Sequence, residues 1–281
     1  MTTIPLRAKF ALASGVLMLV LGASAPAYAG DQVQLLPGIP NIDGTWERYR
    51  AKPGDPGAPP REAQAPMKPN VLSAWQARQA ARRAADARGQ PLITHNAYCL
   101  PDGMPGMMAG PFPFEILQSP GQVTIVQEAY NQIRRIYLDK PQAAMSDIEL
   151  GYYGHSVGRW NSDGVLSVDT IGIKDYVRFR DVPHTPQMHI SERLRLVTAD
   201  ILWDEVTITD PAVLTQPWTV TFAYKRLPGY EILEYICEDN RERANDNGEL
   251  ELGLSKQQPA APAGTQPAGE KGRAEETPGH Q

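Results

Sequence analysis

Short runs of alternating apolar and polar residues recur along most of the chain, and short turn sequences separate them. The clearest pair, 155–160 and 165–171, flanks Asn161-Ser162-Asp163-Gly164, a sequence typical of a hairpin turn. On this pattern about ten strands are expected, at 44–49, 114–117, 123–128, 133–138, 155–160, 165–171, 188–197, 201–208, 218–224 and 230–236. Their regular spacing predicts an antiparallel meander. We expect the meander to close into an up-and-down barrel, which removes its exposed edges.

One segment has a helical pattern instead. Residues 71–88 are rich in alanine, arginine and glutamine, with Asn70 as the candidate N-cap and Gly89 as the stop. The apolar positions form a narrow stripe through Val71, Trp75 and the alanines, which predicts a single helix on the surface of the barrel. Its arginines either attract anions or face solvent.

The first 29 residues have the order of a secretory signal peptide. A short basic region is followed by an apolar run at 10–21 and by the small residues Ala27 and Ala29. This run is too short to span a bilayer, and no later run is long enough, so no transmembrane segment is expected in the mature chain. We therefore expect export to the periplasm or the medium.

The remaining chain divides into one domain and a tail. A single β-barrel domain is expected at 30–244, with the Pro-rich segment 51–69 as a loose connection inside it. Residues 245–281 are polar and end in a run rich in Pro, Ala and Gly. Such a segment cannot bury enough apolar surface to offset its ordering entropy, which predicts an unstructured tail.

Composition narrows the function classes. The 281 residues are 42% hydrophobic and carry a formal net charge of -5. An acidic balance argues against nucleic acid as the partner, because phosphate binding needs a basic surface. The sequence contains no Gly-rich phosphate loop, no Gly-x-Ser-x-Gly elbow, no HExxH and no CxxC. Nucleotide-dependent enzymes, α/β-hydrolases and zinc proteases are therefore disfavoured, and no cofactor is expected.

The chain has two cysteines, Cys99 and Cys237. In an exported protein an even count favours a disulfide bond between them. Two buried free thiols are the alternative, and a metal site would lack the usual CxxC spacing.

Gly44-Thr45-Trp46 on the first predicted strand, with Lys225 or Arg226 ending a late strand, resembles the lipocalin signature. In lipocalins this tryptophan closes the base of the barrel and the late basic residue packs across it. The resemblance implies a lipocalin-like barrel, although the helix between the first two strands departs from the lipocalin pattern.

A longer stretch, 99–240, resembles a family of secreted bacterial proteins of unassigned function. The motifs that carry the resemblance are CLPDGMP at 99–105, GHSVGRW at 154–160 and HISER at 189–193. The resemblance implies kinship and brings no activity with it.

Acidic residues interrupt strands that otherwise have the pattern of core. If Ala199-Asp200 is a two-residue turn, Leu194 faces Glu205, and Glu192 lies diagonally from Glu205 on one largely apolar face. Two shielded carboxylates repel, so one pKa should rise and the pair can work as acid and base. The alternative is that each glutamate pairs with an arginine for structure, with Arg134, Arg193 and Arg195 as candidates.

Histidines add a second set of candidate catalytic residues. His155 opens a strand and Asp169 lies on its hairpin partner, and a histidine oriented by an aspartate is a general-base arrangement. His189 begins the strand that holds Glu192. With His184, these groups could form a metal site of His/His/Glu type, but their spacing matches no familiar pattern and no metal is expected. Partly exposed histidines at strand ends are the alternative.

An apolar pocket is expected at the mouth of the barrel. The loop 101–113 lacks a regular pattern yet contains Met104, Met107, Met108 and Phe112, and adaptable methionines suit an apolar ligand. The aromatic side chains expected beside them are Tyr137, Trp160 and Trp203. Ordinary core packing is the alternative for both sets.

The sequence therefore predicts an exported enzyme that performs cofactor-free acid–base chemistry on a small hydrophobic or aromatic molecule. The reaction class would be a lyase, an isomerase or a hydrolase. The alternatives are a non-catalytic lipocalin-like carrier of a small ligand and a structural envelope protein. We favour the enzyme because a carrier of apolar ligands would not need shielded Glu, Asp and His, whose burial is costly.

Overall fold

The structure is a computed structural model that describes residues 38–93, 95–237, 242–244 and 250–252. The expected signal peptide and most of the expected tail lie outside these described residues. Strand β11 (Leu250–Leu252) falls within the expected tail and pairs with β10 (Glu242–Ala244) in a two-stranded sheet. In the described part of the chain, no helix combines the length and apolar character needed to cross a membrane.

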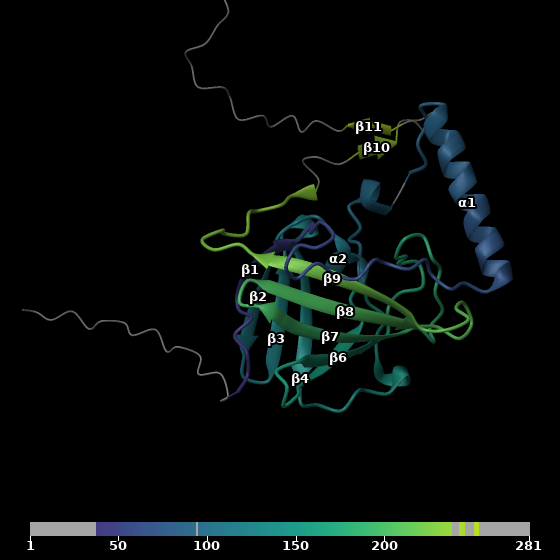
Figure 1. The fold of residues 1–281 in the computed structure, drawn as a ribbon. Helices are drawn as coiled ribbons and strands as arrows, with labels where there is room; N and C mark the ends of the chain where they lie inside the picture. Colours follow the sequence, from purple (N-terminus) through teal and green to yellow (C-terminus); the bar gives the residue numbers. More distant parts are fainter. Residues whose placement is uncertain (1–37, 94, 238–241, 245–249, 253–281) are drawn as a thin grey trace, which may run out of the picture. The chain divides into compact units, whose positions relative to one another are not determined.

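Nine strands form a closed barrel, so the predicted β-barrel with one long helix is confirmed (Figure 1). Consecutive strands are neighbours, and β9 pairs with β1 to close the ring. The barrel strands are β1 (Gly44–Arg48), β2 (Phe114–Ser119), β3 (Gln122–Gln127), β4 (Gln132–Leu138), β5 (His155–Trp160), β6 (Leu166–Ile171), β7 (His189–Thr198), β8 (Ile201–Thr209) and β9 (Trp218–Arg226).

The barrel departs from the expected up-and-down order at one joint. Strands β4 and β5 run parallel, with Ile136 opposite Ser156 and Leu138 opposite Gly158. A parallel pair needs a crossover connection, which here is the segment 139–154 with its short helix η3 (Met145–Asp147). The crossover lacks a strong local pattern, and for that reason the sequence predicted a simple meander.

The predicted tenth strand, 230–236, is not a strand. These residues are irregular, and the carbonyl of Tyr235 accepts a hydrogen bond from Nδ2 of Asn131 at 2.7 Å. Soon after them, a disulfide joins Cys237 to Cys99, whose Cα atoms are 5.6 Å apart. The predicted disulfide is confirmed.

Alternation along the strands places apolar side chains inside the barrel. In β3, for example, Val123 and Ile125 are fully buried while Thr124 between them is only partly buried. At the β1–β9 joint, the guanidinium of Arg226 lies 4.2 Å from the centroid of the buried Trp46 ring. Nη1 of Arg226 also donates to the carbonyl of Asp43. A late basic residue thus packs over the tryptophan of the first strand.

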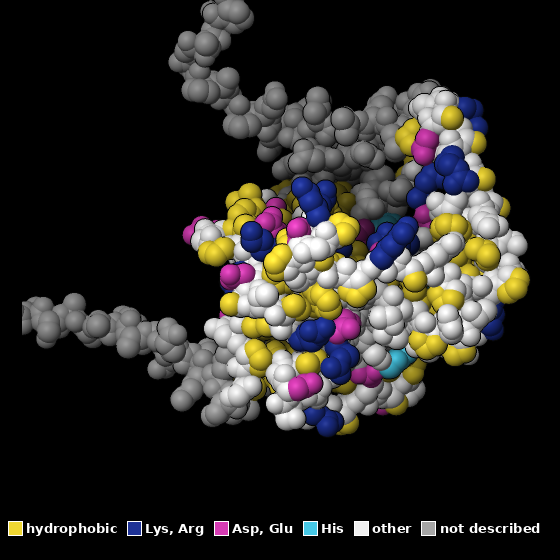
Figure 2. Space-filling model, in the orientation of Figure 1, with side chains coloured by type: hydrophobic (Ala, Val, Ile, Leu, Met, Phe, Trp, Pro, Cys, Tyr) yellow, Lys and Arg dark blue, Asp and Glu magenta, His cyan; other side chains and the backbone are white. Residues whose placement is uncertain are grey.

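Helix α1 (Pro69–Ala87) is the predicted surface helix. It begins one residue before Asn70, at a proline whose fixed φ suits the first turn, and Asn70 is therefore not the cap. Its apolar residues Val71, Leu72 and Trp75 pack against the core of the barrel. Figure 2 shows basic side chains gathered along this helix.

The Pro-rich segment 51–68 is not a loose connection. The indole of Trp203 donates to the carbonyl of Gly57 at 2.8 Å, and the indole of Trp218 donates to the carbonyl of Ala63 at 2.9 Å. Prolines lack N–H groups but keep their carbonyls, so a chain of this composition is held well by donors from outside it. These two hydrogen bonds hold the segment against β8, which contains Trp203, and β9, which contains Trp218.

Candidate functional site

A charged cluster occupies the centre of the barrel; we call Arg134, Glu192 and Asp204 the interior cluster. All three side chains are at most 1% exposed. Nη1 of Arg134 donates to Oε1 of Glu192 at 2.8 Å, and Nη2 donates to the other carboxylate oxygen. The guanidinium also donates to Ser156 and Thr170, at 3.2 and 3.0 Å. This is a two-pronged, charge-assisted ion pair with its remaining donors satisfied.

The register of β7 and β8 brings Asp204 into this cluster. An irregularity between Leu196 and Thr198 shifts the pairing by one residue from the expected register. Leu194 therefore faces Asp204 rather than Glu205. Alternation does not reveal such a bulge, and a shift of one residue reverses which side chains point inward.

The predicted carboxylate pair of Glu192 and Glu205 is therefore wrong. Glu205 lies on the outer side of β8, where its Oε2 accepts a hydrogen bond from Nε of Arg195 at 3.1 Å. The two acidic groups that do meet inside are Glu192 and Asp204.

Burial raises the pKa of the Asp204 carboxyl well above its usual range. The charge of Glu192 raises this pKa further, while the charges of Arg134 and Arg48 oppose the shift. Neither oxygen of Asp204 receives a hydrogen bond from a donor in the described residues. A protonated Asp204 accounts for both observations, because a neutral carboxyl places no second negative charge beside Glu192.

The surroundings of the interior cluster are closed. The hydroxyl of Tyr224, whose pKa burial raises well above its usual value, donates to the carbonyl of Met108 at 2.6 Å. The guanidinium of Arg48 lies over the rings of Phe222 and Tyr224, at 4.9 and 5.6 Å. The side chains of Arg134 and Glu192 have no exposed surface at all. The cluster therefore has the geometry of a structural ion pair, the alternative that the sequence left open.

The other predicted catalytic residues lie on the outside of the barrel. Nε2 of His189 contacts Oδ1 of Asp169. The second oxygen of Asp169 accepts a hydrogen bond from Nε2 of Gln142 at 3.0 Å, and Oε1 of Gln142 is 2.6 Å from Nδ1 of His155. We call these four residues the outer-wall array. The two predicted sets do not line one pocket, because Glu192 faces the interior and the histidines face outward.

Gln142, which the sequence did not single out, orients His155. Nε2 of Gln142 donates to the main-chain carbonyls of His155 and Asp169, at 3.3 and 3.1 Å. Its carbonyl oxygen must therefore face the imidazole, which places the ring proton on Nδ1 and leaves Nε2 of His155 as the basic atom. The imidazole also stacks on Tyr137, with ring centroids 5.6 Å apart.

An open groove of about 470 Å³ runs along β5 to β7 beside the outer-wall array. Asp169 is part of its lining and is 36% exposed. Its basic lining residues are Lys140, Arg159 and Arg193. Polar molecules therefore have access to the aspartate that contacts His189.

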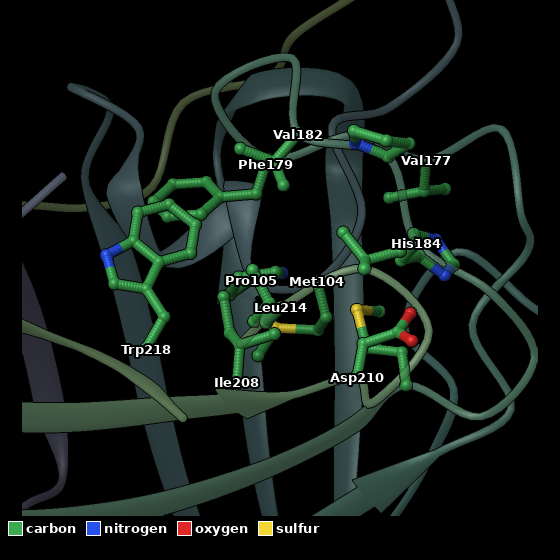
Figure 3. A pocket seen from close by; sticks show the side chains of 13 residues that line it. Met104, Pro105, Val177, Phe179, Val182, His184, Ile208, Asp210, Leu214 and Trp218 are labelled. Carbon is green, nitrogen blue, oxygen red and sulfur yellow. The ribbon is translucent and has the colours of Figure 1, made fainter. Parts of the chain in front are cut away.

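An apolar cavity, the end cavity, lies where β8 ends and β9 begins (Figure 3). Its volume of about 20 Å³ gives room for about one water molecule. The rings of Phe179 and Trp218 lie 5.3 Å apart in its wall. Its main apolar lining residues are Met104, Phe179, Met188, Ile208, Leu214 and Trp218.

The polar groups of the end cavity are already occupied. Nε2 of His184 is 2.9 Å from the carbonyl of Lys174. The carboxylate of Asp210 accepts hydrogen bonds from the main-chain N–H groups of Thr185 and Ala212, at 2.6 and 3.0 Å. The surface offered to a ligand is therefore apolar.

Of the seven predicted ligand-binding residues, only Met104 lines the end cavity. Met107 and Met108, on the one-turn helix α2 (Gly106–Ala109), are buried core. Phe112 is 37% exposed, and its ring meets Tyr235. The others also lie elsewhere: Tyr137 stacks on His155, Trp160 packs against the core and Trp203 lies under the guanidinium of Arg195.

The sequence missed most of the cavity wall. Phe179, Val182 and Met188 belong to the segment 172–188 between β6 and β7. Large apolar residues in a segment without a strand pattern were the available signal, because such side chains must pack on something.

Neither a protein-family model nor a curated protein matches the sequence. The site is therefore interpreted from its own geometry.

Proposed function

We propose that the protein is a non-catalytic barrel that binds a small apolar molecule in the end cavity. The observation that carries this proposal is a cavity whose wall is apolar and whose two polar lining groups, His184 and Asp210, already have main-chain partners. A ligand with polar groups would bury them beside His184 and Asp210 without a hydrogen-bond partner, which costs free energy. An apolar ligand has no hydrogen bonds to water to give up.

The interior cluster supports the same choice. The sequence favours an enzyme over a carrier only because it predicts shielded Glu, Asp and His side chains. Glu192 has Arg134 as a two-pronged partner, and no side-chain surface of either residue is exposed. The ion pair with Arg134 thus explains the buried charge of Glu192 without a role in catalysis.

We propose that binding takes place outside the cytoplasm, in the periplasm or the medium. The bond between Cys99 and Cys237 supports this location, since disulfides persist in oxidising compartments.

Fluorescence titration with N-phenyl-1-naphthylamine, a neutral apolar probe, tests the binding proposal. Leu214→Gln places an amide in the cavity wall and should weaken binding at least tenfold. Leu117→Gln is the matched control, because Leu117 is 44% exposed on β2 and does not line the end cavity. Absence of saturable binding, or equal loss in both variants, would contradict the proposal.

A second candidate function is acid–base catalysis at the outer-wall array. It is supported by the orientation of His155 through Gln142 and by the contact of His189 with Asp169 beside the open groove. An imidazole with one nitrogen anchored and the other basic is suited to a lyase, isomerase or hydrolase.

Hydrolysis of p-nitrophenyl acetate is a simple probe of this second candidate. His155→Gln and His189→Gln should each lower the rate at least tenfold. His95→Gln is the control, since His95 contacts Asp102 rather than the array. If the three variants and the wild type have the same rate, the array is not catalytic.

A further inference from the structure

A tight turn covers one side of the end cavity. Val182 and Phe179 are paired across this turn, and the N–H of Val182 donates to the carbonyl of Phe179 at 3.0 Å. The two residues between them, Arg180 and Asp181, both have positive φ, at 53° and 62°. Two successive positive φ values form a turn that Asn and Gly prefer. The conformation therefore depends on contacts from outside the turn.

Helix α1 supplies the first of these contacts. Asp181 accepts hydrogen bonds from Arg82 and Gln79, each at 2.9 Å, and the indole of Trp75 donates to the carbonyl of Arg180 at 3.1 Å. The three helix residues are four and three positions apart, so they form one stripe along α1. The apolar first part of this stripe packs on the barrel, and its polar second part holds the turn.

The segment before α1 supplies another contact. Nη2 of Arg180 donates to Oε2 of Glu62 at 2.5 Å. Both central residues of the turn are therefore held by side chains that come from far away in the sequence.

The turn faces the cavity with its two end residues. Phe179 and Val182 both line the end cavity, on the opposite side from Ile208 and Asp210 (Figure 3). With the turn in this position the cavity has room for about one water molecule. A larger ligand requires part of the wall to move, and Phe179 and Val182 are the lining residues that the turn carries.

We propose that residues 179–182 are a lid over the end cavity and that α1 is the latch that holds this lid closed through Asp181. This inference rests on the proposed binding function. The latch is suited to release, because the Arg82 and Asp181 side chains are 38% and 22% exposed. An ion pair at such a site contributes modestly and weakens with salt. Uptake and release of the ligand are then controlled by the opening of this pair.

Stopped-flow measurement of N-phenyl-1-naphthylamine release tests the latch. Asp181→Asn removes the charge of the carboxylate and keeps a residue that tolerates the positive φ, and Arg82→Gln removes its cationic partner. Both variants should release the probe about two- to fivefold faster than the wild type, which is the effect expected of a partly exposed ion pair. Raising the salt concentration should speed release from the wild type more than from the two variants, in which only the Arg180–Glu62 pair remains to be screened. Arg83→Gln, an exposed neighbour on α1, is the matched control and should behave as the wild type does.

A second measurement needs no ligand. The N–H of Val182 closes the turn, so its hydrogen exchange reports lid opening directly. Arg82→Gln should speed this exchange about two- to fivefold, and Arg83→Gln should leave it unchanged.

The outcomes separate the two proposals. Unchanged exchange and unchanged release in a protein that binds the probe would overturn the latch and leave the binding function intact. Absence of binding in the wild type and in Asp181→Asn would overturn both. Binding that appears only in Asp181→Asn would support the latch strongly.

Discussion

Asp204 lies diagonally across from Glu192 inside the barrel, and Arg134 forms its ion pair with Glu192. The relationship follows from the register, which sets Leu194 opposite Asp204 and Val206 opposite Glu192. Arg134 neutralises the charge of Glu192, so the carboxyl group of Asp204 is most stable as the neutral acid. Because the pKa of Asp204 is raised in the folded protein, the free energy of unfolding should depend on pH through this residue.

Asp204→Asn should raise the free energy of unfolding at pH 7, because the folded barrel holds this carboxyl neutral while the unfolded chain ionises it. The folded pKa of Asp204 lies above the unfolded value. As the pH rises above about 4, the unfolded chain ionises first and the wild type loses stability, until the folded pKa is passed. The gain should therefore shrink toward zero near pH 4.

Urea unfolding between pH 4 and pH 8 measures this difference. Asp200→Asn is the control, since Asp200 is exposed in the turn between β7 and β8. A gain that does not change with pH would mean that Asp204 is already ionised in the folded barrel.

Arg134→Met should destabilise the barrel by about 3–5 kcal/mol, because it leaves the Glu192 carboxylate buried without a partner. The double substitution Arg134→Met with Glu192→Met should cost less than the single one, since no buried charge remains. Denaturant unfolding of the four proteins in this cycle gives both values. Arg195→Met breaks a partly exposed pair with Glu205 and should cost only about 0–1 kcal/mol.

Removing the disulfide should also lower stability. Cys99 and Cys237 are 138 positions apart, and a loop of this length constrains the unfolded chain by about 5 kcal/mol on the chain-entropy model. Cys99→Ser combined with Cys237→Ser should therefore unfold at a lower denaturant concentration than the oxidised wild type. Reduction should shift the wild type to the same midpoint and leave the double variant unmoved. If reduction has no effect on the wild type, the bond contributes nothing.

Trp203→Phe should free part of the Pro-rich segment. Phenylalanine keeps an aromatic ring beside Arg195 but loses the hydrogen bond to Gly57, which is worth about 1 kcal/mol. Limited proteolysis should then cut the segment 51–60 faster than in the wild type. Trp160→Phe is the comparison, and equal cutting of both variants would assign the segment's order to other contacts.

Local patterns predicted the fold better than the site. The hairpin at 155–171 and the helix at 69–87 depend on neighbouring residues, so turn chemistry and periodicity were sufficient to predict them. The bulge before Thr198 and the cavity wall at 172–188 depend on contacts between distant parts of the chain. The single slipped register is the reason that Glu205 was placed inside and Asp204 was overlooked.

The parallel pair of β4 and β5 allows the barrel to close with an odd number of strands. In a closed ring whose strands alternate strictly in direction, the number of strands must be even. Nine strands close only if an odd number of neighbouring pairs run parallel, and here β4 and β5 are that pair. The return segment that this odd count requires contains Gln142, and Gln142 joins His155 to Asp169. The link between His155 and Asp169 in the outer-wall array thus depends on the crossover that the odd strand number requires.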